Sequence, residues 1–190
     1  LVIESTYGDR LHPAGDPQQE LGGWLQRALA RNGVVVIPTF AVGRAQSLML
    51  HIAGLKAAGG IPDVPVFLDS PMAIDATALY GFFRAEHRLT EAECRRTFGA
   101  VRLVNTPDQS KELDRHGGPM IVLAASGMAT GGRVLHHLKT FIGDSRNLVL
   151  FAGFQAPGTR GALLVAGARS VRIHGQDFEV QAEVGQLEVM

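Results

Sequence analysis

The stretch Gly33-Val34-Val35-Val36-Ile37-Pro38-Thr39-Phe40-Ala41-Val42-Gly43-Arg44 carries the pattern that decides the fold. It begins with a β-branched apolar run, which favours a buried strand, and continues through a short loop with proline and glycine. Leu48, Ile52 and Leu55 then follow at helical spacing within residues 41–58. The stretch therefore predicts a strand, a tight loop and a helix, in that order.

The same pattern recurs along the chain. Three further apolar runs have the length of buried strands: residues 64–68, 120–124 and 148–152. Helices are expected after them, from residue 71, at about 133–141 and at about 158–166. Uninterrupted apolar strands that alternate with helices are covered on both faces. We therefore predict an α/β fold with a mostly parallel sheet flanked by helices.

Both ends of the chain lie inside apolar stretches, and residue 1 is a leucine. Residues 171–173, a turn at Gly175 and residues 178–189 predict a hairpin that leaves the parallel sheet. We therefore expect a piece of a longer protein. We expect residues 1–12 to hold a strand that ends an adjoining domain, residues 13–168 to form the main domain, and residues 169–190 to be strands that return to the adjoining domain.

Composition narrows the class of protein. Hydrophobic residues make up 46% and charged residues 19%, which excludes a disordered chain. No apolar run is long enough to span a membrane, and Cys94 as the single cysteine favours a reducing compartment, here the cytoplasm. The formal net charge of zero does not signal a nucleic-acid binder, although 15 arginines against three lysines suit bidentate phosphate contacts. A GC-rich genome is the favoured explanation of the arginines, because many of them lie on ordinary helix faces.

Ligands of open parallel sheets bind outside the carboxyl ends of the strands. Here those ends are followed by hydroxyl groups, glycines and helix N-termini, which favour an anion such as phosphate. The candidate phosphate contacts are Ser5, Thr6, Tyr7, Thr39, Arg44, Ser70, Ser126, Gly127, Met128 and Arg133. Structural roles compete with this interpretation, because Ser5, Thr6 and Ser70 also suit helix caps and Gly127 a tight turn.

Other kinds of site lack support in the sequence. Gly127, Gly131 and Gly132 do not have the spacing of a nucleotide-binding P-loop, nor its Lys-Ser/Thr ending. His136 and His137 are adjacent, so they point to different faces of a helix and do not readily share a metal. No cluster has the His, Asp and Cys set of a zinc site, and we predict no metal ligand in this chain.

Five blocks together resemble the β-CASP group of metallo-β-lactamase-fold nucleases. The resemblance covers essentially the whole chain, and the nearest branch is that of bacterial and archaeal relatives of the endonuclease that cleaves messenger RNA precursors before polyadenylation. The blocks, in order, are Leu1-Val2-Ile3-Glu4-Ser5-Thr6-Tyr7-Gly8-Asp9-Arg10, Ile37-Pro38-Thr39-Phe40-Ala41-Val42-Gly43-Arg44-Ala45-Gln46, Leu68-Asp69-Ser70-Pro71-Met72-Ala73, Ala125-Ser126-Gly127-Met128 with Gly131-Gly132-Arg133 and His136-His137-Leu138-Lys139, and Leu150-Phe151-Ala152-Gly153-Phe154-Gln155-Ala156-Pro157-Gly158-Thr159.

The resemblance implies a two-domain parent in which a metallo-β-lactamase domain holds two zinc ions and the β-CASP domain closes over them. Single-stranded RNA would lie in the cleft between the domains, and a homodimer is left open. Glu4 matches the acidic residue that orients a catalytic histidine in the family, and that histidine is expected beyond Met190. Because the zinc ligands would also lie outside this chain, we expect it to be an RNA-binding clamp domain that is inactive by itself.

Three alternatives stay open. The chain could be a doubly wound module that binds nucleotides or phosphometabolites, although it lacks the acidic residue of a dinucleotide site. It could belong to a non-catalytic pseudo-nuclease scaffold, against which the presence of Glu4 argues mildly. It could belong to the DNA-directed branch of the same group, since nothing in the sequence identifies a contact to the 2′-hydroxyl.

Overall fold

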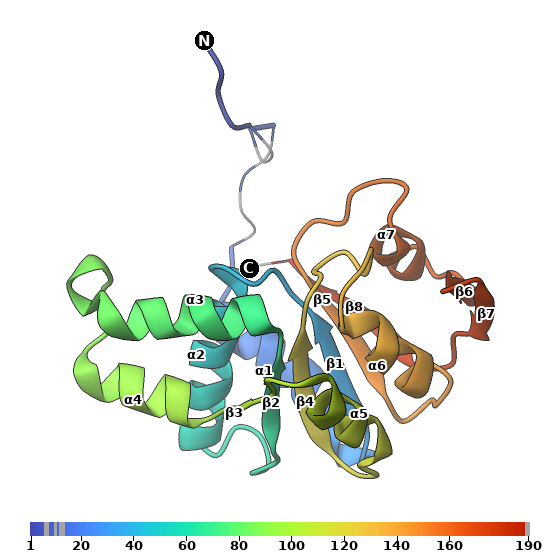
Figure 1. The fold of residues 1–190 in the computed structure, drawn as a ribbon, viewed down its shortest axis with the longest axis horizontal. Helices are drawn as coiled ribbons and strands as arrows, with labels where there is room; N and C mark the ends of the chain where they lie inside the picture. The colour runs from blue at the N-terminus through green and yellow to red at the C-terminus, as the bar shows by residue number, and fades with distance from the viewer. Residues whose placement is uncertain (6–7, 10, 12–13, 189–190) are drawn as a thin grey trace.

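A parallel sheet with the strand order β3-β2-β4-β1-β5-β8 forms the centre of the molecule (Figure 1). The computed structural model describes residues 1–5, 8–9, 11 and 14–188. The sheet strands in these residues are β1 (Val34–Pro38), β2 (Val66–Asp69), β3 (Arg102–Leu103), β4 (Met120–Ala124), β5 (Leu148–Ala152) and β8 (Glu183–Leu187). The predicted α/β fold with a mostly parallel sheet is confirmed.

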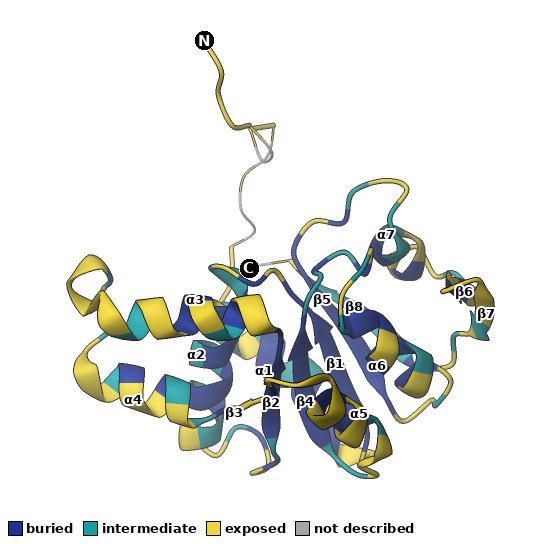
Figure 2. Cartoon of the chain, in the orientation of Figure 1, coloured by how far each residue is buried: buried dark blue, intermediate teal, exposed yellow. Residues whose placement is uncertain are grey.

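Helices cover both faces of this sheet. They are α1 (Pro17–Ala30), α2 (Arg44–Ala57), α3 (Pro71–Phe82), α4 (Glu91–Gly99), α5 (Pro107–Arg115), α6 (Val134–Phe141) and α7 (Arg160–Val165), with a 3-10 turn at Arg84–Glu86. The core of one face is formed with α1 and α2, and the core of the other with α5, α6 and α7. Strands β1, β4 and β5 are buried along their whole length, as Figure 2 shows.

The alternation of side chains along β1 explains why two cores form. Val35 and Ile37 point into the core with α1 and α2, whereas Val34 and Val36 point into the core with α5 and α6. Successive residues of a strand face opposite sides of a sheet, so a continuous run of valine and isoleucine supplies both cores at once. The uninterrupted apolar run is therefore the sequence feature from which the layers follow.

The end of the chain follows the prediction in one part and contradicts it in another. Strands β6 (Ser170–Ile173) and β7 (Gln176–Glu179) form the predicted antiparallel hairpin. The expectation that residues 178–189 leave the parallel sheet is wrong, because β8 pairs in parallel with β5. Gly185 of β8 packs against the Trp24 ring of α1. An edge strand with unequal cover also has alternating polarity, which is the pattern that predicted a hairpin.

The register of the sheet places the strand ends at one edge. Ala124 at the end of β4 is level with Pro38 of β1 on one side and Asp69 of β2 on the other. The loops after these strands therefore start side by side. The expectation of a strand at the start of the chain is wrong for residues 1–5, which form no strand and extend away from this body (Figure 1). In the part of the chain that the structure describes, no helix has the length and apolar character needed to cross a membrane.

Candidate nucleic-acid interface

Loops from four strands meet at the carboxyl edge of the sheet, where the sequence predicts the site. They follow β1 (residues 39–43), β2 (residue 70), β4 (residues 125–133) and β5 (residues 153–159). Backbone and side-chain hydrogen bonds tie them together: Thr39 N donates to Ala124 O at 2.9 Å, and Gln155 Nε2 donates to Gly127 O at 3.2 Å. The edge is thus a connected surface, which we call the rim.

Arg44 begins helix α2 and borders a hollow in the rim of about 460 Å³, together with Phe40, Val42, Gly43 and Ser47. Among the described residues, its guanidinium has neither a hydrogen-bond partner nor an ion-pair partner. Arg44 is half-buried, so its cation is held at the rim and is open to a ligand. The first turn of the helix, which also favours an anion, lies beside it.

Large apolar side chains are exposed along the same rim. Phe40 is 45% exposed and Phe154 is 37% exposed. Each is the second residue after a buried strand, β1 for Phe40 and β5 for Phe154. Val42 and Met72 are exposed as well. The candidates from the sequence were hydroxyl-bearing residues, glycines and arginines, so these apolar residues were missed. The phenylalanines in Pro-Thr-Phe and Gly-Phe-Gln were the sequence signal that could have identified Phe40 and Phe154. Aromatic faces at a rim can stack on unpaired nucleobases.

The loop after β4 closes on itself. The Ser126 hydroxyl accepts hydrogen bonds from the amides of Thr130 (3.1 Å) and Gly131 (3.2 Å). Gly127 lies against Phe40, because a Cβ there would be 2.8 Å from the phenylalanine ring. The candidates Ser126 and Gly127 therefore shape the rim. Met128 is partly buried and its carbonyl accepts from Gly161 N at 3.0 Å.

Thr39 and Ser70 are buried rather than presented to a ligand. The Ser70 hydroxyl accepts a hydrogen bond from Ala73 N at 3.3 Å and so caps α3. The competing interpretation of Ser70 as a helix cap thus describes its geometry. The Thr39 hydroxyl donates to the Phe40 carbonyl at 3.3 Å. Both residues support the rim from beneath.

Arg133 points inward, unlike Arg44. Its guanidinium donates to Asp69 Oδ1 at 2.5 Å, to the carbonyl of Val104 at 2.9 Å and to the carbonyl of Asn105 at 3.0 Å. The side chain of Arg133 is 19% exposed and that of Asp69 is fully buried. Because this arginine is already matched with a carboxylate and two carbonyls, we no longer propose it as a phosphate contact.

Asp69 and His137 continue this arrangement into a buried charge cluster. His137 Nε2 lies 2.7 Å from Asp69 Oδ2, and His137 Nδ1 lies 2.7 Å from Asp114 Oδ1. Ser110 Oγ donates to Asp69 Oδ2 at 2.5 Å. An ionised carboxylate only accepts hydrogen bonds, so both ring nitrogens of His137 must carry protons. The cluster then balances an imidazolium and a guanidinium against two carboxylates.

The surroundings shift the pKa values in the direction that this pairing requires. Burial lowers the pKa of His137, but the hydrogen bonds with Asp114 and Asp69 outweigh it and raise the pKa from 6.5 to about 8. Burial raises the pKa of Asp69, but hydrogen bonds from His137, Ser110 and Arg133 outweigh it and hold the pKa below its ordinary value. At neutral pH the buried groups are therefore charged and paired.

A comparison with protein families decides the identity of the fold. Residues 45–164 match the Beta-Casp domain. The chain belongs to the β-CASP family. The resemblance of the five sequence blocks is thereby confirmed. The four blocks after Leu1–Arg10 lie at or near the rim or in the charge cluster beneath it.

Curated relatives of this β-CASP domain include ribonucleases and termination factors. The chain is 39% identical over 196 residues to ribonuclease TTHA0252 of Thermus thermophilus, which covers 98% of this chain and 44% of that protein. It is 35% identical to the transcription termination factor FttA of Lokiarchaeum (89% of this chain, 28% of the relative). It is 31% identical to an RNase J-like protein of Methanocaldococcus jannaschii (99% and 45%). The chain thus spans less than half the length of these relatives.

Of the candidates at the start of the chain, Glu4 and Ser5 are described, and they lie away from the rim. Glu4 and Ser5 are exposed and belong to the irregular segment of residues 1–5. Thr6 and Tyr7 fall outside the described residues. Ser5 caps no helix among the described residues, because the first of these helices, α1, begins at Pro17 and is capped by Asp16. The role of Glu4 toward a catalytic histidine stays a proposal.

The zinc that the family resemblance implies does not fit the described residues. Within them, no three His, Cys, Asp or Glu side chains lie together in a way that could hold a metal ion. The buried cluster is also unsuitable by its chemistry, because both nitrogens of His137 donate to carboxylates and have no lone pair to offer. We therefore derive no reaction step through zinc.

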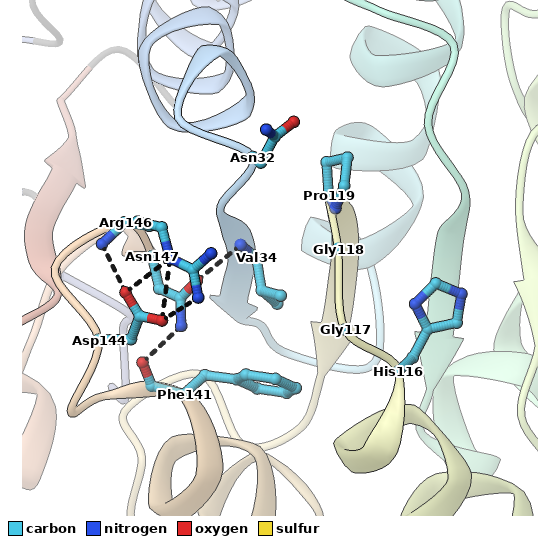
Figure 3. A pocket seen from close by; sticks show the side chains of 10 residues that line it. All are labelled: Asn32, Val34, His116, Gly117, Gly118, Pro119, Phe141, Asp144, Arg146 and Asn147. Carbon is cyan, nitrogen blue, oxygen red and sulfur yellow. Dashed lines mark hydrogen bonds and ion pairs between the residues drawn. The ribbon is translucent and has the colours of Figure 1, made fainter.

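A second hollow, of about 390 Å³, lies at the opposite edge of the sheet, where the strands begin (Figure 3). Its buried Asn147 accepts from Val34 N at 2.8 Å and donates to Phe141 O at 2.8 Å. Its Arg146 is paired with Asp144 at 2.6 Å. The buried amide and the ion pair of this hollow are thus satisfied within the β-CASP domain. Among the residues that the structure describes, it exposes no aromatic ring beside an unpaired arginine, whereas the rim does, so the rim is the better candidate for RNA.

Proposed function

We propose that this β-CASP domain is the RNA-binding clamp of a zinc-dependent ribonuclease, and that single-stranded RNA runs along the rim. The observation that carries the proposal is the side chain of Arg44, which has no partner among the described residues and borders a rim hollow together with exposed Phe40. A guanidinium is suited to bidentate pairing with a phosphodiester. The relatives that are named ribonuclease and RNase J-like protein support RNA as the substrate class.

The neighbouring residues have distinct roles in this proposal. Arg44 pairs with a backbone phosphate, which fixes the strand without reading its sequence. Phe40 and Phe154 offer ring faces to the bases, and stacking of this kind tolerates every base. Ser126, Gly127 and Met128 border the same path, because Gly127 packs on the Phe40 ring. A base must leave its helix to stack on a side chain, so an aromatic rim favours single strands over duplexes.

The reaction belongs to the longer protein in this proposal. Hydrolysis of the phosphodiester would occur in an adjoining metallo-β-lactamase domain, with zinc held by residues other than the described ones and Glu4 orienting a histidine of that site. The 190-residue chain alone is then expected not to cleave RNA. Chelator-sensitive cleavage by the clean chain would overturn this expectation. Loss of cleavage on Glu4→Ala in a protein that contains both domains would support the role of Glu4.

Fluorescence anisotropy with a labelled single-stranded RNA tests the clamp directly. Arg44→Ala is expected to weaken binding by roughly tenfold or more, the scale of a hydrogen bond to a charged group. Arg96→Ala is the matched control, because Arg96 is an exposed arginine on α4, a helix that contributes no loop to the rim. Equal affinities of the two variants would contradict the assignment of Arg44.

A second pair of variants separates stacking from simple apolar contact. Phe40→Leu keeps an apolar side chain but removes the ring, whereas Phe40→Trp keeps a stacking surface. We expect the leucine variant to lose roughly fivefold in affinity for single-stranded RNA and the tryptophan variant to retain it. Binding of single-stranded DNA or of free nucleotides with equal or higher affinity would instead favour the DNA-directed or nucleotide-binding alternatives.

A further inference from the structure

We propose that the buried cluster of Asp69, Asp114, Arg133 and His137 is a positioning device that holds the loop of residues 125–133 in its RNA-binding shape, and that this hold weakens when His137 loses its proton. The inference rests on the proposed function, because it assigns the loop to RNA. Of these four residues, the sequence offered only Arg133 as a candidate phosphate contact. None of the four is placed in contact with RNA.

The cluster reaches the loop through Arg133. This residue is the last of the loop and immediately precedes α6. The loop is closed at its base by a hydrogen bond from Val134 N to Ala125 O at 3.0 Å. The Arg133 guanidinium then fastens that base to the end of β2 through Asp69 and to the segment after β3 through the carbonyls of Val104 and Asn105. A change in the charges around Asp69 therefore alters its ion pair with Arg133, which holds the base of the loop.

His137 is the group whose charge can change. It is fully buried and each ring nitrogen meets a carboxylate oxygen at 2.7 Å. Loss of one proton leaves a nitrogen lone pair against a carboxylate and gives the buried cluster a net negative charge. Uncompensated charge in a buried site is costly, so the cluster must open or rearrange. Because Arg133 and His137 share the Asp69 carboxylate, that rearrangement includes the anchor of the loop.

The groups around His137 define the titration. Asp69 faces it from β2 and Asp114 from α5. Arg133, which immediately precedes the helix of His137, donates to the same Asp69. The Phe141 ring stacks on the imidazole with centroids 6.4 Å apart. The remaining charged residues of α5 pair with one another on its exposed side: Lys111 with Asp108 and Arg115 with Glu112. With a pKa of about 8, His137 changes charge between about pH 7 and 9.

The experiment follows two signals of the 190-residue chain against pH. One is the protonation of His137, read from the nitrogen chemical shifts of its ring, and the other is the affinity for labelled single-stranded RNA. In the wild type we expect affinity to fall by roughly fivefold with the midpoint of the His137 titration, a modest coupling between two sites. Arg44→Ala should lower the affinity at every pH and leave the midpoint where it is.

Asp114→Asn is the variant that separates positioning from simple support. Asp114 is partly exposed and its replacement leaves Asp69 and Arg133 in place, while one of the two carboxylates that favour the imidazolium is removed. The pKa of His137 should fall, and the alkaline loss of RNA affinity should move to lower pH with it. A shifted His137 titration with an unmoved affinity profile would overturn the proposal, since a merely structural role predicts that outcome.

A separate readout distinguishes failure of this inference from failure of the RNA proposal. The backbone amide shifts of residues 126–132 report the shape of the loop without RNA. If the wild type binds no single-stranded RNA, the proposed function fails, yet these shifts should still follow the His137 midpoint. Loop shifts that do not change as His137 titrates would overturn the positioning role, whether or not RNA binds.

Discussion

Arg44 and Arg133 enter the structure in similar ways and end in opposite environments. Each stands at the start of a helix, after a loop that leaves a buried parallel strand. Arg44 has no side-chain partner in the described part of the chain, whereas Arg133 bonds Asp69 and two carbonyls. We therefore propose that Arg44 binds the ligand and that Arg133 stabilises the loops of the rim.

The comparison shows what decides the fate of an arginine at such an edge. The partner of Arg133 is Asp69, 64 residues away in the sequence and at the carboxyl end of the strand beside β4. Arg44 follows β1, and the two strands beside β1, which are β4 and β5, end in Ala124 and Ala152 and supply no carboxylate. The chemistry of the neighbouring strand end, rather than the local motif, therefore separates a buried ion pair from an open cation.

Removal of Asp69 should have the largest effect on stability. Asp69→Ala leaves Arg133 and His137 as buried cations with no shared carboxylate, so we expect the free energy of unfolding to fall by about 3–5 kcal/mol. Asp63→Ala is a suitable control, because Asp63 also forms an ion pair, with Lys56 at 2.7 Å, but its side chain is 93% exposed. The control should lose much less stability, because solvent screens an exposed ion pair. Similar losses for both variants in urea unfolding would contradict the importance of the cluster.

The pH dependence of stability should identify the charged state of the cluster. Folding raises the pKa of His137 from 6.5 to about 8, so the stabilisation is complete below pH 6.5 and is lost as the pH rises through about 8. The loss corresponds to about 2 kcal/mol. Urea unfolding of the wild type should show this decline between pH 6.5 and 9, and His137→Gln should not. A wild-type stability that is flat or rises over this window would contradict an imidazolium at His137.

Two adjacent glycines allow the shape of the loop after β4 to be tested with a matched pair. Gly132 has a φ of +77°, and a Cβ there would lie 2.4 Å from the Ala125 carbonyl oxygen. A Cβ at Gly131 would meet no atom within 4 Å. We expect Gly132→Ala to destabilise the chain by at least about 1 kcal/mol and Gly131→Ala to have a smaller effect. Equal melting temperatures of the two variants would indicate that the loop has another shape.

Arg44 should give the smallest effect on stability. Its side chain has no partner to lose among the described residues, so Arg44→Ala should change the free energy of unfolding by less than about 0.5 kcal/mol. Arg133→Ala, measured alongside, should be much less stable because it leaves Asp69 without its guanidinium. Comparable destabilisation of the two variants would remove the contrast between the two arginines.

The sequence was informative where a pattern is local. The apolar runs that became β1, β2, β4 and β5 follow from residue type alone, and parallel pairing then fixes the edge at which the loops gather. Strand β8 was misplaced because its alternation suits both an edge strand and a hairpin. Which of these forms depends on whether Trp24 of α1 covers Gly185, a contact between distant parts of the chain.

The candidate site was predictable in place but not in its chemistry. Arg44, Ser126 and Gly127 lie at the rim as expected, and the family that the sequence blocks resemble is confirmed. The charge cluster was missed, because Asp69, Asp114 and His137 are far apart in the sequence and each has an ordinary explanation where it stands. Only the fold shows that one buried carboxylate serves Arg133, Ser110 and His137 together.

The most direct test of the account is the salt dependence of RNA binding by the wild type and Arg44→Ala. Each phosphate contact adds to the slope of log affinity against log salt concentration, by about 0.7 for single strands. We predict that Arg44→Ala binds more weakly, has a slope shallower by about this amount, and unfolds at the same urea concentration as the wild type. An unchanged affinity and slope in a folded Arg44→Ala variant would contradict the assignment of the rim to RNA.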